Sequence, residues 1–148
     1  MKNERWITIH SVDTDGSGEE EMEITVRGTL RGSEEDYCLR FEELFGEGLK
    51  SKTEIRVQGR RCASIVRRGD LNSELTVEAG KRHACVYATP YGEMNLGVFA
   101  REVFSDMDMR QGGELRLNYV VDYNGSLGAH KKMLVRVGEP IASAPRKI

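Results

Sequence analysis

The chain has 148 residues, of which 39% are hydrophobic and 31% are charged, and its formal net charge is −2. A chain of this length and composition predicts one globular domain with an ordinary core and argues against disorder. The slightly acidic balance also argues against a dedicated nucleic-acid-binding protein, because such proteins are usually basic.

The cysteines and the N-terminal residues indicate the cellular compartment of the protein. Cys38, Cys62 and Cys85 are odd in number and have no close spacing, which argues against a disulfide framework and a structural zinc site. The N-terminal residues contain no apolar secretory segment, and no run approaches the roughly 20 apolar residues that span a membrane. We therefore expect a cytoplasmic protein of bacterial type, with one domain over residues 1–148 and a loosely held tail from about residue 138.

The dominant pattern is a short-range alternation of apolar and polar residues, which is typical of β-strands. In chain order, the alternating runs cover residues 5–12, 21–30, 36–43, 53–58, 62–68, 74–78, 82–89, 93–101, 114–124 and 131–137. Turn segments such as Asp15-Gly16-Ser17-Gly18 and Asn124-Gly125 separate the runs. A faint helical spacing over residues 41–49 and 98–107 predicts a helical turn or two at most.

About ten strands without a long helix predict an all-β barrel or sandwich. Closure removes open sheet edges, and consecutive hairpins suit an up-and-down order. We therefore expect a single antiparallel, closed or nearly closed β-barrel of about 8–10 strands. A β-sandwich is the alternative.

Several polar residues fall in the apolar phase of their strands, and alternation would place them inside the barrel. An interior carboxylate and guanidinium must be compensated by each other, by phenols or by a ligand. The sequence thus predicts a pocket for a small polar or amphipathic ligand. Its predicted lining residues are Glu43, Arg67, Tyr87, Thr89 and Tyr119. The alternative is that these residues lie at strand ends or brace the interior, and that the protein is an interaction or oligomeric module.

Four segments in these same runs carry a family resemblance. They are Phe41-Glu42-Glu43, Arg67-Arg68-Gly69, Tyr87-Ala88-Thr89-Pro90-Tyr91-Gly92 and Leu117-Asn118-Tyr119. In order and spacing they resemble the YwiB-like family of small bacterial proteins, a domain of unknown function, over roughly residues 6–137. The resemblance implies a calycin (lipocalin-like) β-barrel and supplies no reaction. Phe41 stands where the family often has tyrosine.

Other functions find weaker support in the sequence. His83 and Cys85 share a strand face but lack further recognisable metal ligands. The pairs Arg60-Arg61, Arg67-Arg68 and Lys81-Arg82 could form a basic face for single-stranded nucleic acid. Standard catalytic motifs are absent. We expect no catalytic residue, metal site or cofactor, and we leave open a homodimer that uses apolar groups such as Trp6 and Phe104.

Overall fold

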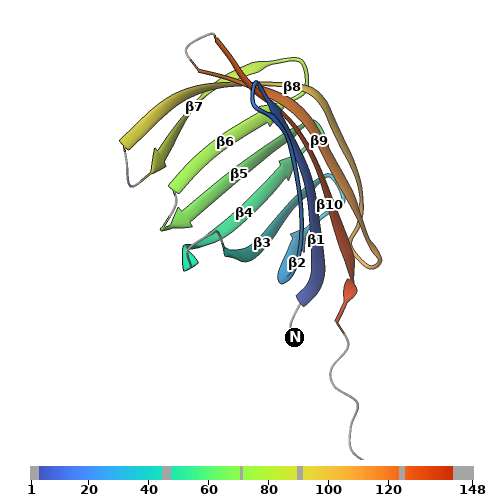
Figure 1. Cartoon of the computed structure of the whole chain (residues 1–148). Helices are drawn as coiled ribbons and strands as arrows, with labels where there is room; N and C mark the ends of the chain where they lie inside the picture. Colours follow the sequence, from blue (N-terminus) through green and yellow to red (C-terminus); the bar gives the residue numbers. More distant parts are fainter. Residues whose placement is uncertain (1–3, 45–47, 71, 90–91, 124–125, 142–148) are drawn as a thin grey trace, which may run out of the picture.

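The computed structural model describes residues 4–44, 48–70, 72–89, 92–123 and 126–141, without the side chains of residues 87–89 and 127. Within these ranges the chain forms ten strands joined as an antiparallel closed barrel, in the order β1-β10-β9-β8-β7-β6-β5-β4-β3-β2 (Figure 1). The strands are β1 (Glu4–Asp15), β2 (Gly18–Gly32), β3 (Asp36–Leu44), β4 (Lys50–Gln58), β5 (Cys62–Gly69), β6 (Asn72–Glu78), β7 (Arg82–Thr89), β8 (Gly92–Asp108), β9 (Gly112–Tyr123) and β10 (Ser126–Pro140). The predicted closed barrel is confirmed, and the sandwich alternative is wrong.

Alternation of inward and outward residues gives the barrel its core. In β4, Ser51, Thr53, Ile55 and Val57 are buried, and the residues between them are exposed or half-buried. The same period in the other strands gathers aliphatic and aromatic side chains inside. Burial of this apolar area stabilises the fold by roughly 25 cal/mol per Å² removed from water. Pairing between the strands keeps the backbone N–H and C=O groups hydrogen-bonded. Fully buried side chains of this core include Ile7, Leu30, Leu39, Ile55, Ile65, Leu115, Leu117 and Val135.

The faint helical spacing over residues 98–107 was misleading, because this whole segment belongs to strand β8. An irregularity in the pairing of β8 with β9, between Ala100 and Glu102, shifts the register. Buried positions are Val98 and Ala100 before it and Ser105 and Met107 after it. A β-bulge inserts one residue and reverses the alternation, which blurs the period of two in the sequence. In the other predicted segment, residues 41–44 belong to β3, and residues 45–47 lie outside the described part.

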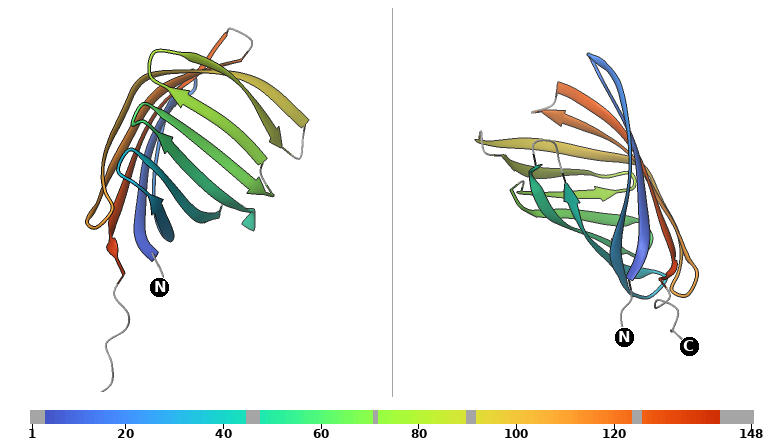
Figure 2. Two further views of the ribbon diagram at one scale, coloured as in Figure 1. Left: turned by 180° about the vertical axis from the view of Figure 1, so that it is seen from behind. Right: turned by 60° about the horizontal axis from the view of Figure 1, so that its bottom comes forward.

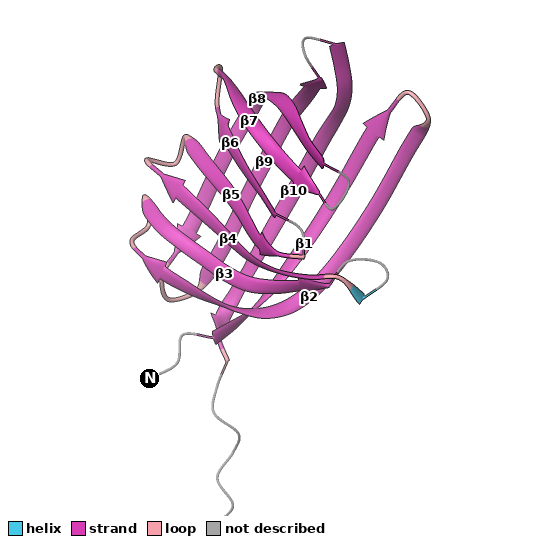
Figure 3. Ribbon diagram, turned by 90° about the vertical axis from the view of Figure 1, so that its left-hand side faces the viewer, coloured by secondary structure: helices cyan, strands magenta, loops and turns pink. Residues whose placement is uncertain are grey.

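Strands β2 and β3 pair only along Gly28–Gly32 and then diverge, whereas β2 stays paired with β1 along the length of β1 (Figure 3). Gly28 lies at the point of divergence. A Cβ atom at this position would lie 2.5 Å from the carbonyl oxygen of Arg40 and 2.5 Å from Cδ1 of Ile7. Only glycine therefore allows β2 to pass this close to β3.

The start of β1 and the end of β10 lie at the same end of the barrel (Figure 2). The predicted tail includes residues 138–140, but these still belong to β10, and the amide of Ile141 donates to the carbonyl oxygen of Glu4 at 2.8 Å. Residues 142–148 lie outside the described part. The described residues include no helix with the length and apolar character needed to cross a lipid bilayer.

Candidate functional site

An ion pair lies inside the barrel wall formed by β3, β4 and β5. Nε of Arg67 on β5 donates to Oε1 of Glu43 on β3 at 2.9 Å, and the Thr53 hydroxyl on β4 donates to the same oxygen. The side chains of Glu43 and Arg67 are 10% and 19% exposed. Alternation explains the meeting, since all three residues occupy the inward phase of adjacent strands. The carboxylate thus has both a cation and a hydroxyl as partners.

Tyr119 on β9 contributes a phenol to the same interior. Its side chain is 1% exposed, and burial raises its pKa to about 12, although the positive charge of Arg67 acts in the opposite direction. Desolvation disfavours a phenolate, so the group keeps its proton at neutral pH. Within the described residues, no hydrogen-bond partner of this hydroxyl is found.

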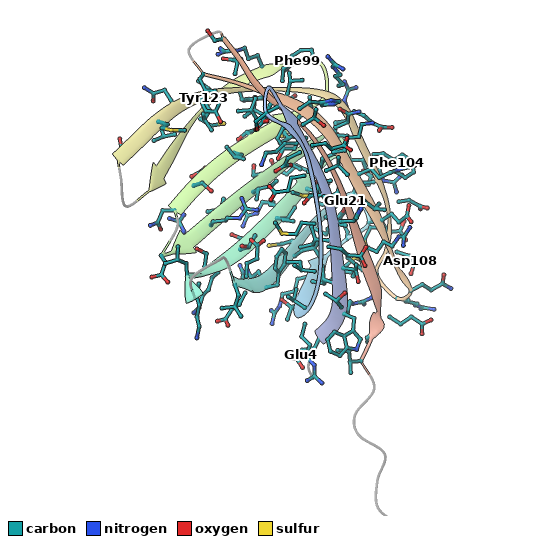
Figure 4. All side chains as sticks on the ribbon, viewed as in Figure 1. Glu4, Glu21, Phe99, Phe104, Asp108 and Tyr123 are labelled. Carbon is teal, nitrogen blue, oxygen red and sulfur yellow. The ribbon has the colours of Figure 1, made fainter. Side chains whose placement is uncertain are left out.

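These groups face a cavity of about 330 Å³ at one end of the barrel. Its entrance carries the ion pair between Asp13 and Lys131, whose Oδ2 and Nζ atoms lie 3.3 Å apart, together with exposed Tyr123. Figure 4 shows Tyr123 at the upper end of the barrel and Glu4 and Asp108 at the opposite end. Between the entrance and Tyr119 the lining is mainly apolar. It includes Ile9, Ile24, Phe41, Ile55, Leu75, Leu96, Val121 and Met133.

The opposite end of the interior is occupied by other side chains. Arg5 is buried there and donates from Nη1 to the carbonyl oxygen of Gly138 at 3.0 Å and from Nη2 to that of Met109. Burial lowers the pKa of Arg5, and nearby Asp108 opposes this shift. The hydroxyls of Tyr37 and Ser105 hydrogen-bond at 2.7 Å. None of these residues lines the cavity, whereas Tyr123 does.

The structure brings together three of the five predicted site residues. Glu43, Arg67 and Tyr119 all line the cavity. Tyr87 and Thr89 belong to β7, and the backbone of Tyr87 lies opposite Met94, another lining residue. The side chains of Tyr87 and Thr89 lie outside the described part of the chain.

Three small polar residues near this ion pair were not predicted from the sequence. Thr53, Ser51 and Ser73 are all buried. The signal was present, because Ser51 and Thr53 share the phase of Ile55 and Val57, and Ser73 shares that of Leu75. Ser73 lies opposite Arg67 in the ladder, and its buried Oγ atom has no hydrogen-bond partner in the described residues. The inward polar set is therefore larger than predicted.

The other side chains considered from the sequence are paired with neighbours or buried. Nε2 of His83 lies 2.9 Å from Oε1 of Glu78, and burial raises the pKa of the Cys85 thiol. The described residues contain no group of three or more side chains placed to hold a metal. Trp6 and Phe104 are exposed, and the guanidinium groups of Arg27 and Arg116 lie 5.1 and 4.2 Å from their ring centres.

An outer hollow of about 830 Å³ lies over β1–β5. Charged side chains that pair with one another line much of it, such as Arg40 with Glu54 at 3.1 Å. Phe41 lines both this hollow and the inner cavity. The inner cavity is the stronger candidate site, because its polar groups are buried and fixed.

Comparison with known proteins agrees with the barrel. Residues 7–134 match the family described as "Domain of unknown function (DUF1934)". The solved crystal structure of the ywiB protein from Bacillus subtilis is similar, with a TM-score of 0.78 and 22% sequence identity. The alignment covers 95% of this chain and 96% of that chain, and at this identity it shows the fold alone. A comparison with curated proteins gave no match. The resemblance predicted from the sequence is confirmed, and the chain belongs to the DUF1934 family of domains of unknown function.

Proposed function

We propose that this barrel is a binding protein that takes a small amphipathic molecule into its inner cavity. The observation that carries the proposal is a cavity of about 330 Å³ in which an apolar wall surrounds Glu43, Arg67 and Tyr119. Small-molecule sites are typically concave, of about 300–1,000 Å³, and mainly apolar with a few placed polar groups. The volume of this cavity lies at the lower end of that range.

The polar groups are held in place by contacts within the protein. Arg67 and Thr53 both donate to Glu43, and Tyr119 is packed in the core. A ligand would therefore meet groups that need little reordering. Fixed groups lower the entropy cost of binding.

The same arrangement favours binding over catalysis. A general acid or base works best with a pKa near the working pH, and the pKa of Tyr119 is raised to about 12. We therefore propose a protein without enzymatic activity. The three cysteines are free thiols, which supports a reducing compartment such as the cytoplasm. The up-and-down order of the closed barrel supports a calycin-like relationship.

One observation favours the alternative of a structural module. Glu43 and Arg67 already compensate each other, so the pair could serve only to fix strand register. The protein would then act through its outer surface, as an interaction module or a homodimer. A cavity that holds a ligand would support the binding function, and a cavity that stays empty would support the structural one.

A matched pair of variants tests the proposal. Ala129 lines the cavity, whereas Ala84 is exposed on β7. We expect Ala129→Phe to weaken binding of the neutral dye aminoanthracene by at least about tenfold, because the new ring fills the cavity. Ala84→Phe should leave the affinity unchanged. Dye fluorescence measures binding, and circular dichroism checks that both variants fold. Equal affinity in both variants, or no dye binding to the unmodified protein, would contradict the proposal.

A further inference from the structure

We infer that the cavity selects an uncharged amphipathic ligand, whose head group is a hydroxyl or an amide and whose body is apolar. This inference rests on the proposed binding function and adds the chemical class of the ligand. It follows from how the charges, the hydrogen-bonding groups and the apolar surface of the cavity are arranged.

The charges of the cavity are already balanced. Deep inside, Arg67 faces Glu43 at 2.9 Å, and at the entrance Lys131 faces Asp13 at 3.3 Å. Lys132, the fifth charged residue of the lining, is exposed to solvent, where water screens its charge. A carboxylate or ammonium group that entered the cavity would lose its hydration and find no unbalanced opposite charge. Burying a charge under such conditions is costly.

Hydrogen-bonding capacity nevertheless remains in the cavity. The Tyr119 hydroxyl can both donate and accept, and it has no partner among the described residues. Oε1 of Glu43 accepts from Thr53 and Arg67, while no described residue donates to Oε2. A ligand hydroxyl or amide carries a donor and an acceptor, so it matches a phenol and a carboxylate that line the same cavity, without bringing a net charge.

The remaining surface favours an apolar body. Between the two ion pairs, the wall consists of side chains such as Ile9, Ile24, Leu96, Val121 and Met133. An alkyl or aryl group placed there is removed from water against matching apolar atoms. The polar head would then lie near Tyr119, and the apolar body would extend toward the entrance at Tyr123.

Four probes with the same alkyl chain test the inference, namely octanol, octanamide, octanoate and octylammonium. Protein-observed NMR at neutral pH gives each dissociation constant and reports whether the fold is kept. We expect octanol and octanamide to bind at least about tenfold more tightly than either ion, because the ions lose more hydration. Tyr119→Phe should weaken octanol binding by about fivefold, the loss of one hydrogen bond. Tyr37→Phe, which removes a phenol hydroxyl at the opposite end of the interior and outside the cavity lining, should leave it unchanged.

The outcomes separate this inference from the proposed function. If octanoate or octylammonium binds as tightly as octanol or more tightly, the inference is overturned and the binding function stands. If Tyr119→Phe and Tyr37→Phe change octanol binding to the same extent, the role given to the Tyr119 hydroxyl is wrong. If none of the four probes shifts the signals of cavity residues, the proposed function fails and the inference fails with it.

Discussion

Replacing Arg67 by methionine should lower the free energy of unfolding by about 3 kcal/mol. Methionine keeps much of the side-chain volume but leaves the Glu43 carboxylate buried without its cation. Removing one partner of a buried ion pair costs more than the pair contributes, because the remaining charge stays desolvated. Partial exposure of Arg67 places the expected loss at the lower end of the usual range. Urea unfolding at neutral pH measures it.

Two controls show whether the stranded carboxylate causes this loss. The double variant Arg67→Met/Glu43→Gln removes the charge and keeps an acceptor for Thr53, so it should regain most of the lost stability. Arg40→Met breaks the exposed pair with Glu54 and should change stability by less than about 1 kcal/mol. A loss below 1 kcal/mol for Arg67→Met, or a double variant as unstable as the single one, would contradict the account.

Tyr119 should make the protein less stable in alkali. The pKa of this phenol is raised from 10.0 to about 12 by burial, so the unfolded chain releases its proton at lower pH than the folded protein does. The contribution of the buried, protonated phenol to the free energy of unfolding is fully present below pH 10. It falls as the pH rises from 10 to about 12, and it is lost above that. A shift of this size corresponds to about 3 kcal/mol.

The comparison with Tyr119→Phe isolates this effect, because phenylalanine keeps the ring and removes the ionisable hydroxyl. Other alkaline titrations, including that of Tyr37, occur equally in both proteins. Urea unfolding at a series of alkaline pH values should show the stability of the unmodified protein falling relative to the variant. A difference that does not change with pH would show that the phenol is not held in a desolvated site.

The strands could be predicted from the sequence because the barrel uses one simple rule. Each strand has one face in the core and one in solvent, and this leaves a period of two in the residue pattern. The rule placed Leu115, Leu117 and Tyr119 correctly on the inner face of β9. It failed only in the second half of β8, where the register shift near Ala100 reverses the phase.

The candidate site could be predicted only in part. Alternation identified Glu43 and Arg67 as inward residues, but their meeting depends on the register between strands, which the sequence does not state. Thr53 was overlooked, since a threonine in a strand draws no attention by itself. Arg5 was also overlooked, because its burial depends on carbonyl groups of residues more than a hundred positions away.

The central claim is that the inner cavity holds a small molecule, and native mass spectrometry of the full chain tests it most directly. The spectrum is recorded for the protein as purified and again after addition of octanol. We expect a one-to-one complex that disappears on denaturation and is lost in Ala129→Phe but kept in Ala84→Phe. Only the mass of the bare chain, both before and after addition of octanol, would contradict it.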